Sequence, residues 1–506
     1  MRWNRKARRG ATAGALIAAF ALSGCSGERV EPVAPLAELT SLLDERVPRL
    51  MDRYDVPGAA VAIVRGGEPV WSAAYGLADM QAGTEMTTDT VFRAESISKS
   101  VTAWGVMTLV RDGLLDLGRP AESYLGPWEL PDSPFDEAAV TVEHLLSNRS
   151  GLPLGTIGPP SEYAPGAPRP TAREFVEQDA TLVSEPGGSF SYSDVGFNTL
   201  ELIVEEVTGE SFVGYMERAV LAPLGMEDSS YAWRPAYAAG LAAGHEMDGT
   251  PVPPYVYPAS AAGGLFVTVD DVARFVAAGM LAAPGAGGAA QGSGSHVREV
   301  LTAHAIRRMY QPRAEIPGLY GQVADAYGLG HFIERLPDGR TAVWHGGQGH
   351  GWMTHFHSVP RSGDGIVVLT NSQRSWPFLA SVLPLWAHWS GIGDVRFGVI
   401  IPATRVFWGV VVAVALAAIW QVYRLVVGVV RGSRRPALVS AGRPLLRGVQ
   451  LLGGTGLIAL VVWRISLPYV DEASIFPAAA PWAAVALIAM GVVLVASATI
   501  PRRGTY

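Results

Sequence analysis

The sequence predicts an α+β domain over residues 36–394, followed by a transmembrane region. Strand patterns of β-branched and apolar residues, bordered by turn residues, occur near both ends of this domain, at Ala59–Val64 and Gly365–Thr370. Helix patterns lie between them, at Ser96–Arg111 and, with apolar positions three or four residues apart, at Thr199–Thr208. This order of elements favours an α+β fold over a regular βαβ series.

Residues 1–24 have the layout of an export signal. A basic start, Met1–Arg9, precedes an apolar run over Ala11–Leu22. The run ends in Leu-Ser-Gly-Cys, which resembles the lipobox of bacterial lipoproteins, so Cys25 is predicted to be the lipidated first residue of the mature protein. Cys25 is the only cysteine, which excludes an intrachain disulfide. An ordinary signal with a chance cysteine is the alternative, and residues 25–35 read as a short tether.

Residues 395–506 are predicted to cross a membrane three times. The mean hydropathy of the chain is +0.22 although only 17% of its residues are charged, a balance typical of proteins with membrane segments. Three apolar stretches account for the positive mean hydropathy. Each is about long enough to cross a hydrocarbon core of roughly 30 Å. They lie near Val406–Val430, Gly448–Pro468 and Pro481–Ile500.

Charged residues around these stretches predict the orientation in a bacterial cytoplasmic membrane. The first joint is rich in arginine, the second joint is acidic, and two further arginines follow the third stretch. By the positive-inside rule, the first joint and the C-terminus are cytoplasmic and the domain before residue 395 is extracytoplasmic. The export signal would send the domain to the same side. The residues concerned are Arg431, Arg434, Arg435, Arg443, Arg447, Asp471, Glu472, Arg502 and Arg503.

The net charge of −7 argues against nucleic acid as a partner, because phosphate binding needs a basic surface. The lipid bilayer and a small-molecule or peptide substrate are the expected partners instead.

The strongest candidate for chemistry is a Ser-x-x-Lys pattern at Ser96 and Lys99; the Gly-x-Ser-x-Gly elbow is absent from the sequence. Three residues apart on a predicted helix, the lysine amine can reach the serine hydroxyl. Free N–H groups at the helix start favour a developing oxyanion, and a neutral lysine can remove the hydroxyl proton. Apart from Lys6, Lys99 is the only lysine of the chain, and arginine, which is used everywhere else, does not deprotonate.

A second pattern, Tyr192-Ser193-Asp194, follows in the order that a known superfamily uses. From about residue 35 to 389 the chain resembles serine β-lactamases and penicillin-binding proteins, closest to the branch of class C β-lactamases, D,D-peptidases and esterases. The resemblance implies an antiparallel sheet with a helical cluster, and a Tyr-x-Asn motif whose tyrosine shares proton transfer with the lysine. Tyr192 matches that tyrosine. Asp194 replaces the asparagine, and a carboxylate accepts but does not donate a hydrogen bond to a substrate amide carbonyl.

A third pattern, His345-Gly346-Gly347-Gln348, resembles the family motif that is Lys-Thr-Gly in many β-lactamases and His-x-Gly in many relatives. Small residues on a strand let substrate lie against its backbone as an added edge. The resemblance implies that the N–H of Gln348 joins that of Ser96 as the oxyanion hole. It also implies that His345 supplies a polar or cationic group beside the substrate. Similar family stretches match Thr141–Pro153 and Ala261–Thr268.

Four histidines within thirteen residues keep a zinc site open as an alternative. The chain has no His-Glu-x-x-His pattern, and this stretch is Gly-rich with strand character. A polar site edge with ordinary strand histidines is therefore favoured, and no metal or other cofactor is expected. The four are His345, His350, His355 and His357.

Together the patterns predict a membrane-anchored, extracytoplasmic serine hydrolase that forms an acyl-enzyme at Ser96 from an amide or ester. D-amino-acid peptides of the cell wall and small esters are the favoured substrates. β-Lactams are an alternative that His345 and Asp194 disfavour, and transpeptidation stays open. An alternative of another class is a non-catalytic penicillin-binding-like sensor that signals through the membrane helices, since three spans exceed what anchoring requires.

Overall fold

The structure is a computed structural model that describes residues 34–280, 300–318, 320–435, 444–466 and 474–501. The predicted export signal, Cys25 and most of the predicted tether lie outside these residues. So do five of the charged residues that predict the membrane orientation, namely Arg443, Asp471, Glu472, Arg502 and Arg503.

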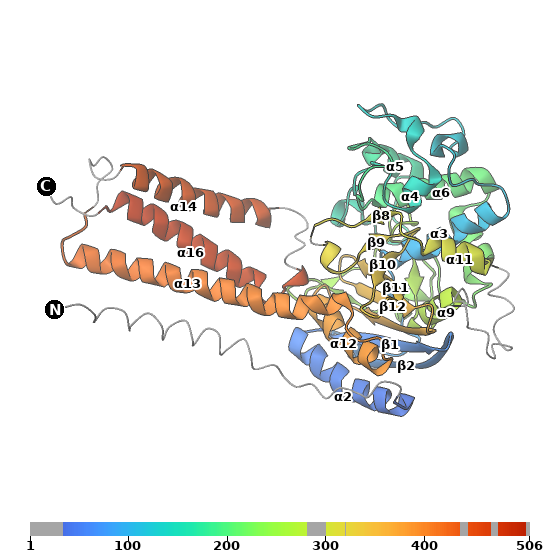
Figure 1. Cartoon of the computed structure of the whole chain (residues 1–506), viewed down its shortest axis with the longest axis horizontal. Helices are drawn as coiled ribbons and strands as arrows, with labels where there is room; N and C mark the ends of the chain where they lie inside the picture. Colours follow the sequence, from blue (N-terminus) through green and yellow to red (C-terminus); the bar gives the residue numbers. More distant parts are fainter. Residues whose placement is uncertain (1–33, 281–299, 319, 436–443, 467–473, 502–506) are drawn as a thin grey trace.

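A nine-stranded antiparallel sheet forms the centre of the domain, in the order β3-β2-β1-β13-β12-β11-β10-β9-β8 (Figure 1). The two segments predicted as strands are β1 and β13, and they are neighbours in the sheet, with Ala59 opposite Thr370 and Val64 opposite Gly365. The first and last parts of the domain thus meet in the middle of the sheet, and the predicted α+β class is confirmed. The strands are β1 (Gly58–Arg65), β2 (Glu68–Asp79), β3 (Thr84–Glu85), β8 (Ala314–Glu315), β9 (Ala326–Tyr327), β10 (Phe332–Arg335), β11 (Thr341–Gln348), β12 (Met353–Val359) and β13 (Asp364–Thr370).

Helices cover both faces of the sheet, because alternate side chains of β1 enter two different apolar cores. Ala59, Val61 and Ile63 enter the core that contains α2 (Leu36–Tyr54) and α12 (Trp376–Trp389). Ala60, Ala62 and Val64 enter the larger core on the other face. That core contains α3 (Ile97–Arg111), α4 (Val142–Leu146), α5 (Ala172–Asp179), α6 (Asp194–Thr208), α7 (Phe212–Met216) and α9 (Val269–Met280).

Short elements connect these layers. Two small antiparallel pairs are formed by β4 (Phe92–Arg93) with β7 (Phe266–Val267) and by β5 (Gly244–His245) with β6 (Pro251–Val252). The short helices are α8 (Tyr237–Gly240), α11 (Ala303–Met309), η1 (Ala121–Tyr124), η2 (Glu137–Ala139), η3 (Pro159–Ser161), η4 (Glu217–Leu221), η5 (Tyr320–Gln322) and η6 (Arg396–Val399).

Both predicted helices of the domain are present. Every residue of α3 from Ile97 to Leu109 is buried, as expected of a helix at the centre of a domain. Helix α6 begins at Asp194, five residues before the predicted Thr199, because the Ser193 hydroxyl caps it by accepting the N–H of Gly196 at 2.9 Å. The capping residue, rather than the apolar spacing, marks where this helix starts.

Within the part of the chain that the structure describes, three helices at the C-terminal end are long and apolar enough to cross a membrane, and they extend together from one end of the domain (Figure 1). Helices α14 and α16 pack closely, since a Cβ added to Gly454 would lie 2.6 Å from the carbonyl oxygen of Gly491. The guanidinium of Arg447 donates to the carbonyl of Ala498 at 2.9 Å, at the end of α16. The helices are α13 (Ile400–Val430), α14 (Pro444–Ile465) and α16 (Ala480–Thr499).

The core of the domain continues past residue 394, into the start of α13. Phe397 and Ile400 are buried in the core of α2 and α12. The carboxylate of Glu334 in β10 accepts the backbone N–H of Arg396 at 2.7 Å. The sheet is thus joined directly to the first of the three apolar helices.

We expect Gly454→Val to destabilise the contact between α14 and α16 by about 1–3 kcal/mol, because the added side chain collides with the facing backbone. Gly456→Val is the matched control, since nothing lies within 4 Å of a Cβ at Gly456. Thermal unfolding of the two detergent-solubilised variants measures the difference, and equal midpoints would contradict the close packing at Gly454.

Candidate active site

Ser96 and Lys99 lie together at the beginning of α3. Lys99 is fully buried, and its amine donates to the Ser96 hydroxyl across 3.1 Å, Nζ to Oγ. Ser96 itself is partly exposed at the N-terminal end of the helix. The predicted pair therefore has the reach that proton transfer requires, with the hydroxyl open to a ligand.

Two other groups hold the Lys99 amine. It donates to the carbonyl of Ala262 at 2.8 Å and forms an ion pair with Asp194 at 2.7 Å, Nζ to Oδ1. Burial lowers the pKa of Lys99, while the carboxylates of Asp194 and, more weakly, Glu95 act in the opposite direction. The balance favours loss of the proton from Lys99 relative to an exposed lysine.

Tyr192 lies beside this pair, just before α6, and its ring centroid is 4.8 Å from Lys99 Nζ. Burial and the charge of Asp194 raise the pKa of Tyr192 well above its ordinary value, and a hydrogen bond with Ser96 acts in the opposite direction. Tyr192 therefore holds its proton and can exchange it with Ser96 rather than stand as a phenolate.

Asp194 occupies the first position of α6, and its carboxylate points to Lys99. The sequence leaves the role of Asp194 open, and the structure pairs its carboxylate with the Lys99 amine. A carboxylate here neutralises the buried ammonium group, which an asparagine would not do.

His345 lies in the middle of β11 and is fully buried. Its Nδ1 is 2.8 Å from the carbonyl of Gly346, and its Nε2 is 3.1 Å from the hydroxyl of Tyr327. Burial, and then the charge of Lys99, hold the pKa of His345 well below its ordinary value. Of the two forms that the sequence leaves open, polar or cationic, these surroundings favour the neutral polar one.

Gly347 and Gln348 complete β11. A Cβ at Gly347 would collide with the carbonyl of Ala94 and the hydroxyl of Thr354, so a glycine is needed for the strand to lie against the segment that precedes Ser96. The side chain of Gln348 accepts the indole N–H of Trp376 at 2.8 Å.

One edge of β11 is open beside these residues. Strand β10 pairs with β11 only over Thr341–Trp344, whereas β12 pairs with it through Gln348. Within the described part of the chain, residues 345–348 are therefore paired in the sheet on one side only, which suits a substrate that binds as an added strand.

Sequence reasoning missed Glu201 and Asn198, which place the carbonyl that holds Lys99. The Glu201 carboxylate accepts the backbone N–H groups of Ser260 at 2.6 Å and Ala261 at 2.7 Å, and burial raises its pKa to about 8. The Asn198 side chain accepts the N–H of Ala262 at 3.1 Å. The sequence signal that could have pointed to Glu201 is a carboxylate among the apolar residues of α6.

The four clustered histidines do not share one set of neighbours. His355 and His357 are buried and 3.4 Å apart, Nε2 to Nδ1. His350 lies between Glu162 and Glu246, at 2.8 Å and 3.1 Å, and these partners raise its pKa to about 9. Within the described residues, no group of three or more His, Cys, Asp or Glu side chains is arranged to hold a metal ion.

Comparison with known proteins identifies the family. Residues 43–412 match the family described as Beta-lactamase, so the chain belongs to the beta-lactamase family, as its motifs predict. The match covers the whole site and ends within α13.

Individual relatives are distant. Esterase EstB of Burkholderia gladioli is 28% identical over 384 residues, which cover 66% of this chain and 91% of that protein. Unguisins hydrolase ungD' of Aspergillus campestris is 26% identical over 356 residues, 67% of this chain but only 63% of that relative. Among solved structures, the octameric penicillin-binding protein homologue from Pyrococcus abyssi matches with a TM-score of 0.56 and 26% identity over 68% of this chain and 77% of that one.

We expect Asp194→Asn to lower the pKa of Lys99 further, because the carboxylate raises it. Lys99 must be neutral to act as the base, so it then becomes active at lower pH. The acid limb of the pH profile for Ser96 labelling by a fluorophosphonate should therefore move down by about one pH unit. Labelling rates measured against pH test this. Asp112→Asn, which removes a carboxylate paired with Arg111 on the surface, is the control. An unchanged acid limb in Asp194→Asn would remove Lys99 as the titrating base.

Proposed function

We propose that the chain is a membrane-anchored, extracytoplasmic serine hydrolase that cleaves amide or ester bonds through an acyl-enzyme at Ser96. The observation that carries the proposal is the 3.1 Å contact between Lys99 Nζ and Ser96 Oγ, in surroundings whose burial lowers the pKa of the amine. Membership in the beta-lactamase family supports it.

Acylation begins when Ser96 Oγ attacks the carbonyl carbon of the substrate. Its proton passes to neutral Lys99 directly or through the Tyr192 hydroxyl, and the electron pair of the carbonyl moves to oxygen. The backbone N–H groups of Ser96 and Gln348 stabilise that oxyanion. When the tetrahedral intermediate collapses, the proton returns to the departing amine or alcohol and Ser96 is left as an ester.

Deacylation repeats these steps with water. Neutral Lys99, directly or through the Tyr192 hydroxyl, takes a proton from the water as it attacks the ester carbonyl. The oxyanion accepts hydrogen bonds from the same two N–H groups, and the proton goes to Ser96 Oγ as the acid is released. An acceptor amine in place of water would give transpeptidation by the same path.

D-amino-acid peptides and small esters are the proposed substrates. The relatives support this range, since one is named an esterase and a solved neighbour is a penicillin-binding protein homologue. β-Lactams are disfavoured because His345 is buried and neutral where lysine is usual in β-lactamases, and because the carboxylate of Asp194 is taken up by Lys99.

One observation favours a sensor as the second candidate. Phe397, in the short helix η6 that leads directly into the first apolar helix, packs against Trp344 and Trp376, with ring centroids 5.9 Å and 5.1 Å away. Trp376 in turn donates to the side chain of Gln348. Two contacts thus lead from Phe397, next to the apolar helix, to Gln348 of the proposed oxyanion hole, and they form a route by which occupancy of the site could reach the membrane.

We expect a fluorophosphonate or a fluorescent penicillin to label the purified chain, and Ser96→Ala to abolish the labelling because the attacking oxygen is gone. Ser98→Ala is the matched control, since Ser98 lies on the same helix turn but its hydroxyl accepts the N–H of Leu265 at 3.1 Å, whereas the Lys99 amine donates to Ser96. Labelling is read by in-gel fluorescence. No acylation of the folded wild-type chain by either probe would favour the sensor.

A substrate panel separates the hydrolase alternatives on the same preparation. Turnover of p-nitrophenyl esters or of D-Ala-D-Ala peptides above that of nitrocefin would support the proposed substrates, and the reverse order would make the chain a β-lactamase.

We expect a reporter fused after Arg435 to give a cytoplasmic signal, because the proposed orientation places the arginine-rich joint inside. Alkaline phosphatase and a fluorescent protein sensitive to export provide opposite readouts of the same fusion site. A fusion after Trp389, at the end of α12, should report the opposite side. An extracytoplasmic signal after Arg435 would overturn the orientation.

A further inference from the structure

Glu95, the residue directly before Ser96, has a backbone conformation that is unusual for glutamate. Its φ of 49° lies in the left-handed region, which glycine adopts freely and residues with a Cβ rarely adopt. Such a conformation persists only where the surroundings hold it, and it is found most often at functional sites.

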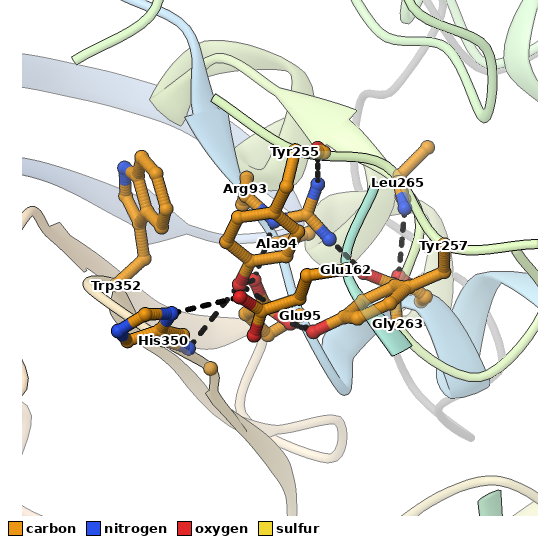
Figure 2. Close-up of polar contacts among 12 residues, drawn as sticks. Arg93, Ala94, Glu95, Glu162, Tyr255, Tyr257, Gly263, Leu265, His350 and Trp352 are labelled. Carbon is orange, nitrogen blue, oxygen red and sulfur yellow. Dashed lines mark hydrogen bonds and ion pairs between the residues drawn. The ribbon is translucent and has the colours of Figure 1, made fainter. Parts of the chain in front are cut away.

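A buried cluster holds the Glu95 side chain (Figure 2). Arg93 forms an ion pair with it at 2.6 Å, and both side chains are almost completely buried. The hydroxyls of Tyr255 and Tyr257 donate to its two oxygens at 3.0 Å and 3.1 Å. Both carboxylate oxygens therefore have charged or hydroxyl donors, the strong kind of hydrogen bond.

Arg93 is itself fixed to the segment that follows Tyr255. Its guanidinium donates to the carbonyls of Tyr255 at 2.7 Å and Gly263 at 3.3 Å, and lies 4.0 Å from the centroid of the Tyr255 ring (Figure 2). The neighbouring Ala262 carbonyl holds the Lys99 amine. The cluster thus belongs to the same frame that positions the proposed base.

The other side of Glu95 contacts the end of β11. A Cβ at Gly349 would collide with the Glu95 carboxylate, and a Cβ at Gly347 would lie 3.0 Å from Glu95 Cβ. The hydroxyl of Thr354 in β12 donates to the Ala94 carbonyl at 2.7 Å and ties the two segments together. Glu95 therefore lies between Ser96 and the two glycines that flank Gln348.

We propose that Glu95 is a positioning residue that aligns the two N–H groups of the oxyanion hole, an inference that rests on the proposed function at Ser96. The backbone of Glu95 directs the N–H of the next residue, Ser96. Its side chain, held by Arg93 and the two tyrosines, sets how closely Gly347 and Gly349, and with them the N–H of Gln348, approach. One residue thus touches both halves of the site that receives the developing negative charge.

Glu95 has no direct part in the chemistry in this proposal. It is 2% exposed, and its oxygens are taken up by Arg93 and the tyrosines. Its effect must therefore fall on the transition state, where charge appears on the substrate oxygen, and not on binding of the uncharged ground state.

The test compares Glu95→Gly, which permits the left-handed backbone but removes the side chain, with Glu95→Gln, which keeps the shape and loses the charge. In the full chain, kcat and KM are measured with a p-nitrophenyl ester, and the affinity for phenylboronic acid is measured in parallel. The boronic acid forms a tetrahedral adduct on serine that places a hydroxyl in the oxyanion hole.

We expect kcat to fall roughly 10- to 100-fold in Glu95→Gly and about fivefold in Glu95→Gln, with KM within about threefold of wild type. Boronic acid affinity should fall in the same order. Asp271→Asn is the control for stability alone. Its carboxylate is also fully buried and paired, with Ser229 and Arg274, on α9 outside the site.

A wild-type kcat and boronic acid affinity in Glu95→Gln, together with the same in any folded Glu95→Gly, would overturn the proposal. A loss of activity in Asp271→Asn as large as that in the Glu95 variants would also overturn it, because loss of stability alone would then explain the lower activity. Full turnover in Ser96→Ala is a different result, since it would overturn the proposed function and not the role of Glu95 alone.

Discussion

The buried amine of Lys99 is the group around which the domain is arranged. Burying a lysine side chain costs free energy unless hydrogen-bonding and charged partners replace the lost water. Ser96, Ala262 and Asp194 supply those partners from three separate segments of the chain. Removal of any one partner would leave the amine under-coordinated, so α3, the start of α6 and the segment after Tyr255 must keep their places relative to one another.

Buried polar side chains hold the backbone segments that make up this arrangement. Glu201 and Asn198 hold the backbone around Ala262. The Arg93–Glu95 pair holds the turn that leads into α3. Each is a buried polar group with its hydrogen bonds satisfied, and such groups fix one arrangement of the surrounding chain where apolar contacts alone would tolerate several.

The features predicted from the sequence are those that depend on the local pattern of residues and on the order of the motifs. Strands β1 and β13, the helix that carries Ser96, the three apolar helices and the family all followed from residue types and their spacing, whereas the pairing of the two strands did not. The start of α6 was predicted late, because a single serine cap decides it and the apolar spacing does not. The partner of Asp194 and the Glu95 cluster escaped prediction for a further reason: their hydrogen bonds join residues as far as 170 positions apart, and no local signal records such contacts.

The way the first apolar helix begins limits how the domain can be separated from it. Phe397 and Ile400 belong to the core, and Glu334 holds the N–H of Arg396. A protease that cut the chain between the sheet and the helix would have to remove these core residues, so the junction resists release of an intact soluble domain. The domain and the helix also share one orientation, because no linker lies between them. Ser96 and the open edge of β11 are thereby held in a set position relative to the axis of this helix, and a substrate has to approach them there.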